Sequence, residues 1–367
     1  MTNETTRRET LIGIGAAAGL ALLPQAACAQ PSRKVGYAIV GLGNYATNQI
    51  MPAFANCKDA RITALVSGTP GKLAKYGAQY GVPEKNRYSY ATFDRIADNP
   101  DVDVVYVILP VAMHAEYSIR ASRAGKHVMC EKPMAPTARE CEAMIAAAAR
   151  AGKKLMIGYR SRFQPHNVAA IELCRTKAIG DLRMIRTAHG FPIQPGVWRL
   201  DRRMSGGGSM MDIGIYSLQA ARYLAGAEPV EVTAVESTDR RDPRFATVED
   251  RVDFTLRFPS GLLASCISSY NSNHNEYRAI GSEGWVELEP ATAYRGQAMR
   301  VRKGGETSTP AIDTSGPDQF AGQLDHFAQC IRDNRTPIVP GEEGLRDIRI
   351  IEAIYRSMRD KRAVALA

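Results

Sequence analysis

The hydrophobic pattern of residues 34–160 predicts short buried strands that alternate with helices. The strands are runs of apolar and β-branched residues, predicted at 34–40, 61–68, 102–110, 127–131 and 153–160. Segments of helical character lie between them, predicted directly after the first strand and at 72–81, 114–126 and 137–152. Apolar strands that alternate with helices indicate a doubly wound parallel sheet, which places this region in the α/β class.

Beyond about residue 160 the pattern changes to strands that are joined mostly by turns. These strands are predicted at 231–238, 251–258, 261–270 and 284–290, and they indicate an antiparallel sheet in a second domain. Two helices with one apolar face are predicted at 319–333 and 342–358. We therefore expect two domains, 30–160 and 161–367, with the option that the terminal helices pack back on the first.

The first 29 residues have the pattern of an export signal. Arg7 and Arg8 precede an apolar run, Leu11 to Leu23, that is too short to span a bilayer, and small residues end at Ala29. We predict a twin-arginine signal over 1–29, cleaved after Ala29; a chance basic pair before an ordinary signal is the alternative. This route exports folded proteins, usually those loaded with a cofactor, so we expect a periplasmic protein without a membrane attachment after cleavage.

Composition and charge exclude several classes of function. The chain has 367 residues, enough for two domains, with 45% hydrophobic and 23% charged residues, typical of a soluble globular protein. The net charge of +9 comes from scattered residues rather than a basic run with aromatics, so no nucleic-acid partner is expected. The 7 cysteines and 6 histidines form no ligand spacing, so no metal is expected and the thiols are predicted to be buried.

A glycine-rich turn follows the first predicted strand. It fits G-x-G-x-x-A and opens a helix, and its candidate binding residues are Gly41, Gly43, Asn44, Tyr45 and Ala46. Such a turn lets backbone amides approach a pyrophosphate at the helix N-terminus, although a bare glycine turn is the alternative.

The residues after the second strand select the cofactor. Sites that prefer NAD usually carry Asp or Glu here, whereas this chain has Ser67, Gly68 and then Lys72. A hydroxyl and a cation suit the 2′-phosphate of NADP. The alternative is that Lys72 is a solvated helix residue.

Lys132 occupies an unusual place for a lysine, between Glu131 and Pro133 at the end of a buried strand. Ligands of open α/β sheets bind at the carboxyl ends of the strands. We therefore expect Lys132 to point at the nicotinamide end of the cleft rather than into solvent.

A third candidate site lies in residues 205–226. Three glycines precede Asp212, and Tyr216 follows four residues later, on the same face if the segment is helical. A nearby ammonium favours the phenolate form of a tyrosine, which makes Tyr216 a candidate acid and base for a carbinol. The alternative is that Asp212 caps a helix and Tyr216 only packs.

Several motifs together resemble the glucose–fructose oxidoreductase/inositol dehydrogenase family, and most of all its glucose–fructose and aldose–aldose oxidoreductase branch. They are AIVGLGNYA, CEKPMA, KKLMIGYR, WRL, GGGSMMDIGIYSL, VED, QLDHFA and PGEEGLRDIRIIEAIY, spread over residues 34–360. The resemblance implies an NADP-binding Rossmann domain, 30–160. It also implies an α+β substrate and dimerisation domain, 161–367, with an open, mostly antiparallel sheet.

The resemblance also implies an activity. Lys132 would polarise the substrate hydroxyl, Tyr216 would take the C1-hydroxyl proton of an aldose as hydride passes to NADP, and Asp212 would orient the sugar. The product is an aldonolactone, and a second sugar then takes the hydride back to give an alditol. In this branch NADP(H) does not leave between the two half-reactions.

Further site residues are carried over from the family. Arg160, Trp198 and Arg199 resemble residues near cofactor and substrate, and Tyr90 is expected at the adenine side. The residues expected to line the nicotinamide edge are Leu109, Pro110, His114 and Glu131. The Lys132–Pro133 bond is expected to be cis.

One departure bears on assembly. The tetrameric sugar enzyme of the family has a long proline-rich arm after its signal, whereas about five residues separate Ala29 from the first strand here. We therefore expect a homodimer. The short segment leaves open whether the protein forms a tetramer and whether it retains its cofactor as firmly as that enzyme.

The competing functions are an NADP-dependent sugar dehydrogenase or reductase with exchangeable cofactor, and a non-catalytic NADP-binding sensor.

Overall fold

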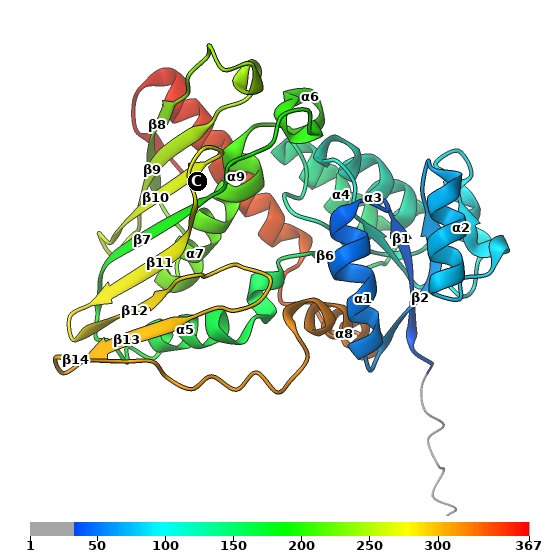
Figure 1. Ribbon diagram of the computed structural model, residues 1–367, viewed down its shortest axis with the longest axis horizontal. Helices are drawn as coiled ribbons and strands as arrows, with labels where there is room; N and C mark the ends of the chain where they lie inside the picture. The colour runs from blue at the N-terminus through cyan, green and yellow to red at the C-terminus, as the bar shows by residue number, and fades with distance from the viewer. Residues whose placement is uncertain (1–32, 367) are drawn as a thin grey trace, which may run out of the picture. The chain divides into compact units, whose positions relative to one another are not determined.

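The computed structural model describes residues 33–366, so the predicted export signal, 1–29, lies outside the described residues. From Lys34 onward the chain forms one unit that contains two β-sheets (Figure 1). Helices pack on these sheets, and the carboxyl ends of the first sheet face the second.

The first sheet is the predicted parallel one. Its strand order is β3-β2-β1-β4-β5-β6, and each neighbouring pair is parallel. The strands are β1 (Val35–Val40), β2 (Ala60–Val66), β3 (Arg87–Tyr88), β4 (Val104–Val107), β5 (His127–Cys130) and β6 (Leu155–Ile157). All six residues of β1 are buried, because helices cover both faces of the sheet.

Two groups of helices bury the two faces of this sheet. The helices of this part of the chain are α1 (Met51–Ala53), α2 (Pro70–Gln79), α3 (His114–Arg123) and α4 (Ala138–Arg150). Tyr37 and Ile39 of β1 pack in one apolar cluster with residues around α1, while Ala38 and Val40 belong to another that includes residues of α3 and α4. The alternation of β1 side chains thus builds a core on each side of the sheet.

The second sheet has nine strands in the order β14-β13-β12-β11-β7-β10-β9-β8-β15. They are β7 (Leu182–Gly190), β8 (Glu231–Ser237), β9 (Arg251–Arg257), β10 (Leu263–Ser269), β11 (His274–Gly281), β12 (Gly284–Leu288), β13 (Met299–Lys303), β14 (Glu306–Ser308) and β15 (Val364–Ala365). The neighbouring pairs are antiparallel except β7 and β10, which are parallel. The predicted α/β class with an open, mostly antiparallel second sheet is confirmed.

One face of the second sheet is covered and the other is open (Figure 1). The helices beside it are α5 (Pro165–Arg175), α6 (Arg202–Ser205), α7 (Ile215–Ala225) and α9 (Gly341–Asp360), of which α5, α7 and α9 pack on the strands. In β9 the buried residues are Val252, Phe254 and Leu256, and the residues between them point to the open side. This alternation is expected of a sheet with one core face.

The C-terminal helices connect the two sheets. Helix α8 (Gln319–Arg332) packs on the first sheet, where Leu324 accepts a hydrogen bond from the Tyr37 hydroxyl at 2.9 Å and Asp325 accepts one from the Ala60 amide at 3.1 Å. Helix α9 contacts both α4 and β8. No helix in the described part of the chain is long and apolar enough to cross a membrane.

Candidate active site

A cavity of about 1690 Å³ lies between the carboxyl ends of the first sheet and the second sheet. Its walls come from the glycine turn after β1, the ends of β2, β4 and β5, the segment that leads into α7, and the loops around β11. This is the position at which open α/β sheets bind their ligands.

The glycine turn forms the wall at one end of the cavity. Gly41 has φ of +95°, and a Cβ there would lie 2.2 Å from the Ile108 carbonyl oxygen, so only glycine fits beside β4. A Cβ on Gly43 would meet no atom within 4 Å, because this residue faces open space. The predicted residues of the turn all line the cavity: Gly41, Gly43, Asn44, Tyr45 and Ala46.

The end of β2 fits a 2′-phosphate. Ser67, Gly68, Lys72 and Tyr90, the residues predicted to bind this part of the cofactor, all line the cavity. The Lys72 ammonium donates a hydrogen bond of 2.9 Å to the Leu42 carbonyl of the glycine turn, so its charge is held at the cavity wall. The carboxylates of the described lining all lie on other elements, at Glu131, Asp212, Glu276 and Glu289. A cation and a hydroxyl without a carboxylate match the acceptor-rich, anionic group of NADP.

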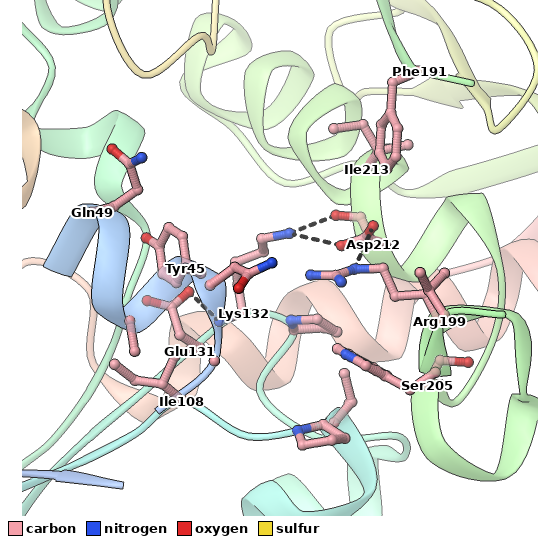
Figure 2. A pocket seen from close by; sticks show the side chains of 18 of the residues that line it. Tyr45, Gln49, Ile108, Glu131, Lys132, Phe191, Arg199, Ser205, Asp212 and Ile213 are labelled. Atoms are coloured by element: carbon pink, nitrogen blue, oxygen red, sulfur yellow. Dashed lines mark hydrogen bonds and ion pairs between the residues drawn. The ribbon is translucent and has the colours of Figure 1, made fainter. Parts of the chain in front are cut away.

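Lys132 and Asp212 meet at the other end of the cavity (Figure 2). The Lys132 Nζ donates to the Asp212 carbonyl oxygen at 2.6 Å and lies 3.4 Å from its Oδ1. Arg199 approaches the same carboxylate, with its Nε 2.9 Å from Oδ2. The Lys132–Pro133 peptide bond is cis, as the resemblance implies.

Asp212 remains ionised in this setting. Burial disfavours its charge, but Arg199, Lys132 and the Tyr270 hydroxyl, 3.1 Å from Oδ2, outweigh burial and lower the pKa of Asp212 to about 2. Asp212 belongs to a π-helical turn, Met210–Gly214, whose N-cap residue is Ser209. The alternative that Asp212 serves as a helix cap is therefore wrong.

Two cations flank the Tyr216 ring. The Lys132 Nζ lies 4.9 Å from the ring centroid, and the Arg160 guanidinium carbon lies 5.0 Å from it. Tyr216 is the second residue of α7 and is 7% exposed, and it lines the cavity together with Asp212. Both cations make cation–π contacts with this ring, and they bring positive charge to the part of the cavity that Tyr216 lines.

His189 packs behind Tyr216 as a neutral imidazole. Its Nδ1 lies 2.9 Å from the Ser217 Oγ, and its ring centroid lies 5.9 Å from that of Tyr216. Burial, with the nearby charge of Arg160, lowers the pKa of His189 to about 3. His189 therefore carries no positive charge near neutral pH.

Glu131 supports the strand end that carries Lys132. It is buried and accepts a short hydrogen bond from the Tyr106 hydroxyl, and the Lys132 amide donates to its Oε2 at 3.3 Å. Burial raises the pKa of Glu131 against the opposing effects of Tyr106 and Lys132. Glu131 lines the cavity, as predicted.

The structure places the remaining predicted residues in two groups. Those that line the cavity are Leu109, Pro110, Arg160, Trp198 and Arg199. His114 does not line it: this side chain is 1% exposed, and its ring nitrogens lie 2.8 Å from the Leu109 carbonyl oxygen and 3.0 Å from that of Pro133. It supports the cavity wall from behind, because its helix α3 packs under the ends of β4 and β5.

Three lining or supporting residues have no signal in the sequence motifs: His189, Tyr270 and Tyr294. Tyr270 directly follows β10, and it reaches Asp212 because β10 packs on the π-helical turn.

Within residues 33–366 no group of His, Cys, Asp and Glu side chains is arranged to hold a metal ion, and the six cysteines there are free and buried.

Two family models match most of the chain. Residues 35–159 match an oxidoreductase family with an NAD-binding Rossmann fold, and residues 171–366 match the C-terminal alpha/beta domain of the same family. The boundary between the two models falls between β6 and β7, where the first sheet ends and the second begins.

Similar proteins act on sugars. The crystal structure of an aldose–aldose oxidoreductase from Caulobacter crescentus, complexed with glycerol, is 61% identical, with a TM-score of 0.90 over 91% of this chain and 100% of that chain. A D-xylose 1-dehydrogenase [NADP(+)] from Haloarcula marismortui is 32% identical over 90% of this chain and 93% of its own length. A D-xylose 1-dehydrogenase (NADP(+)) from Haloferax volcanii is 28% identical over 90% and 99%.

These matches confirm the resemblance that the motifs carry. Both domain models, the order of the two sheets and the relatives agree over nearly all of the described chain. The chain is therefore an oxidoreductase and belongs to the glucose–fructose oxidoreductase/inositol dehydrogenase (Gfo/Idh/MocA) family.

Proposed function

We propose that the protein oxidises an aldose at C1 to an aldonolactone and reduces a second sugar to an alditol, with one NADP(H) that stays bound. The observation that carries the proposal is the position of the Lys132 ammonium, between the Asp212 carboxylate and the Tyr216 ring in the cavity. The similarity to an aldose–aldose oxidoreductase supports the choice of sugars as substrates.

In the oxidative half-reaction Tyr216 accepts the proton of the C1 hydroxyl. Lys132 stabilises the phenolate that takes this proton and the negative charge that develops on the sugar oxygen, because its ammonium lies over the ring. Asp212 holds Lys132 in this direction and offers carboxylate oxygens to sugar hydroxyls. When bound, NADP supplies the hydride acceptor, and its reduced form supplies the donor.

In the reductive half-reaction the same residues work in reverse. Tyr216 returns its proton to the carbonyl oxygen of the second sugar, and Lys132 polarises that carbonyl. No net proton leaves the site over a full cycle. A retained cofactor therefore needs no proton path to solvent, which agrees with the 7% exposure of Tyr216.

An exchanging dehydrogenase is the second candidate. The printed activity of the Haloarcula marismortui relative, D-xylose 1-dehydrogenase [NADP(+)], favours it. The two candidates use the same Lys132, Asp212 and Tyr216. The exchanging dehydrogenase differs in that it releases NADPH after oxidising one aldose and does not pass the hydride to a second sugar. The intact geometry of these three residues speaks against a non-catalytic sensor.

Product analysis separates the two candidates. The protein is incubated with one aldose and a trace of NADP far below the sugar concentration, and both sugar products are quantified. The proposal predicts equal amounts of aldonate and alditol, many times the amount of NADP present. Aldonate limited to the amount of NADP would support the exchanging dehydrogenase, and Tyr216→Phe is the control that lacks the proton carrier.

We also propose that the protein forms a homodimer through the open face of the second sheet. Met184, Val235 and Leu263 are 37%, 62% and 47% exposed, and the strand register places them on this same face. Exposed apolar residues that gather on one face favour association. Sedimentation should show a dimer for the wild type and a monomer for Leu263→Glu; a monomeric wild type would refute the assembly.

The proposed location is the periplasm, reached by export of the folded holoprotein. Arg7, Arg8 and the run that ends at Ala29 support this proposal. Fractionation of cells that express the chain tests it, with Arg7→Lys/Arg8→Lys as the matched variant. Accumulation of the wild type in the cytoplasm, or equal export of the variant, would contradict the twin-arginine route.

A further inference from the structure

Three aromatic rings meet beside the glycine turn. The ring centroid of Tyr294 lies 6.1 Å from that of Tyr45 and 5.6 Å from that of Phe320, and Tyr45 and Phe320 are 6.2 Å apart. The contacts of Phe320 with both tyrosines are edge-to-face, the favourable geometry for aromatic pairs. Tyr45 and Tyr294 both line the cavity.

The rings come from different parts of the chain. Tyr45 follows the glycine turn, and Phe320 in α8 belongs to the core on one face of the first sheet. Tyr294 lies between β12 and β13 of the second sheet. The contact of Tyr294 with Tyr45 therefore connects the second sheet to the turn that is expected to bind the cofactor pyrophosphate.

The segment that carries Tyr294 is held in place by side chains. Asn275 Oδ1 accepts from the Thr292 amide at 2.7 Å, Arg160 donates to the Thr292 carbonyl at 2.6 Å, and Gln319 Nε2 donates to the Tyr294 carbonyl at 2.8 Å. These bonds use backbone atoms of the segment. Removing the Tyr294 ring would leave them in place.

Tyr294 combines firm attachment with a position at the cavity mouth. The residue remains 45% exposed although its ring contacts two others, and the Arg160 guanidinium carbon lies 4.8 Å from the ring centroid. Burial and the neighbouring Tyr216 raise the pKa of Tyr294 to about 12, so the phenol is neutral and does not repel a phosphate. The Tyr294 ring is thus half exposed, while hydrogen bonds hold its backbone and the neighbouring side chains hold its ring. A residue held in this way is suited to narrow the opening of the cavity.

We propose that Tyr294 closes on Tyr45 across the cofactor cleft and that this contact slows the release of bound NADP(H). The inference rests on the proposed function, because it needs NADP(H) in the cavity. A dinucleotide that leaves past the glycine turn must separate the two rings first. Loss of the contact therefore accelerates dissociation more than association.

The test measures the release of NADPH from the holoprotein. Protein loaded with NADPH is mixed with a large excess of NADP, and the decay of bound-NADPH fluorescence gives the dissociation rate. Tyr294→Ala should release NADPH about tenfold faster, the change expected for loss of a well-packed aromatic pair. Tyr294→Phe keeps the ring and should release NADPH at the wild-type rate, and thermal unfolding checks that both variants fold.

A double-mutant cycle with Tyr45→Ala tests the pairing directly. If the rings act on each other, the double variant should release NADPH no faster than the faster single variant. Equal release rates from wild type and Tyr294→Ala would overturn the proposed role of the Tyr294–Tyr45 contact. Additive effects in the cycle, or fast release from Tyr294→Phe, would overturn it as well. A wild-type protein that binds no NADPH would overturn the proposed function and the role of the Tyr294–Tyr45 contact together. If NADPH binds but wild type and Tyr294→Ala release it at equal rates, only the role of the contact is overturned.

Discussion

Replacing Asp212 by Asn removes one charge at the centre of the site and leaves the shape of the side chain almost unchanged. In the structure this carboxylate faces Lys132 and Arg199 and accepts a hydrogen bond from Tyr270. The amide nitrogen of Asn would face a cation or the Tyr270 hydroxyl. Lys132 would keep its bond to the carbonyl of residue 212 but lose the charge that directs it.

The expected effect follows from the burial of the groups. The side chains of Asp212 and Lys132 are 17% and 15% exposed, and Arg199 is 36% exposed, so the pair with Lys132 is the better shielded of the two. Breaking a buried ion pair by removing one partner costs about 3 kcal/mol or more. If that cost falls on the transition state, turnover drops by about a hundredfold.

Single-turnover kinetics measures this effect. Holoprotein with bound NADP is mixed with an aldose, and the appearance of reduced nicotinamide gives the rate of the oxidative half-reaction. Tyr270→Phe is the matched control, because it removes one hydrogen bond to the same carboxylate and should cost about 1.5 kcal/mol, roughly tenfold. An Asp212→Asn rate within a few-fold of wild type, or one no slower than that of Tyr270→Phe, would show that turnover does not depend on the charge of Asp212.

Three further predictions follow from the same structure. Lys132→Ala should lose turnover by about a thousandfold or more while it still binds NADP, measured by single turnover and by bound-cofactor absorbance; surviving turnover would contradict the role of Lys132. The folded-state pKa of His189, about 3, lies below the unfolded value of about 6.5, so its stabilising effect is complete above about pH 6.5 and is lost as the pH falls toward 3. His189→Gln should therefore flatten the acid-side loss of stability in urea titrations, and an unchanged pH profile would contradict this. Asp347→Ala should lower the free energy of unfolding by about 3 kcal/mol, because it leaves the buried Arg222 without its best-buried partner; denaturant titration checks this, and a loss below about 1 kcal/mol would contradict it.

Much of the fold can be predicted from the sequence, because the strands of the first sheet are recognisable as short apolar runs between helical segments. The strands β1, β2, β4, β5 and β6 are mostly apolar runs, since helices cover both faces of the parallel sheet. The sequence pattern does not predict the two-residue strand β3 of the first sheet. It also does not predict β7, β11, β13, β14 and β15 of the second sheet. Their residues alternate weakly or carry many charges, as in the sequence MRVRK of β13, because one side of the second sheet is open to solvent.

The site residues also fall into two groups, those that a sequence motif predicts and those that only tertiary contacts bring to the site. The glycine turn, the residues after β2 and the Glu131–Pro133 stretch could be predicted, because each needs a particular residue type at a strand end. Tyr270 and Tyr294 could not, since they reach the site through contacts between elements far apart in the sequence. The family resemblance implies that His114 lines the cavity, but a resemblance does not reveal on which side of the cavity wall a side chain lies.

The most direct test of the central claim is the near-ultraviolet absorbance of the purified, dialysed protein during the addition of two sugars, with no cofactor supplied. The account predicts that the band of reduced nicotinamide rises when an aldose is added and falls again when a second sugar follows. Tyr216→Phe should show neither change while it keeps its bound cofactor. A protein that carries no nicotinamide after dialysis, or one whose band rises but is not discharged by any sugar, would contradict a cycle that runs on retained NADP(H).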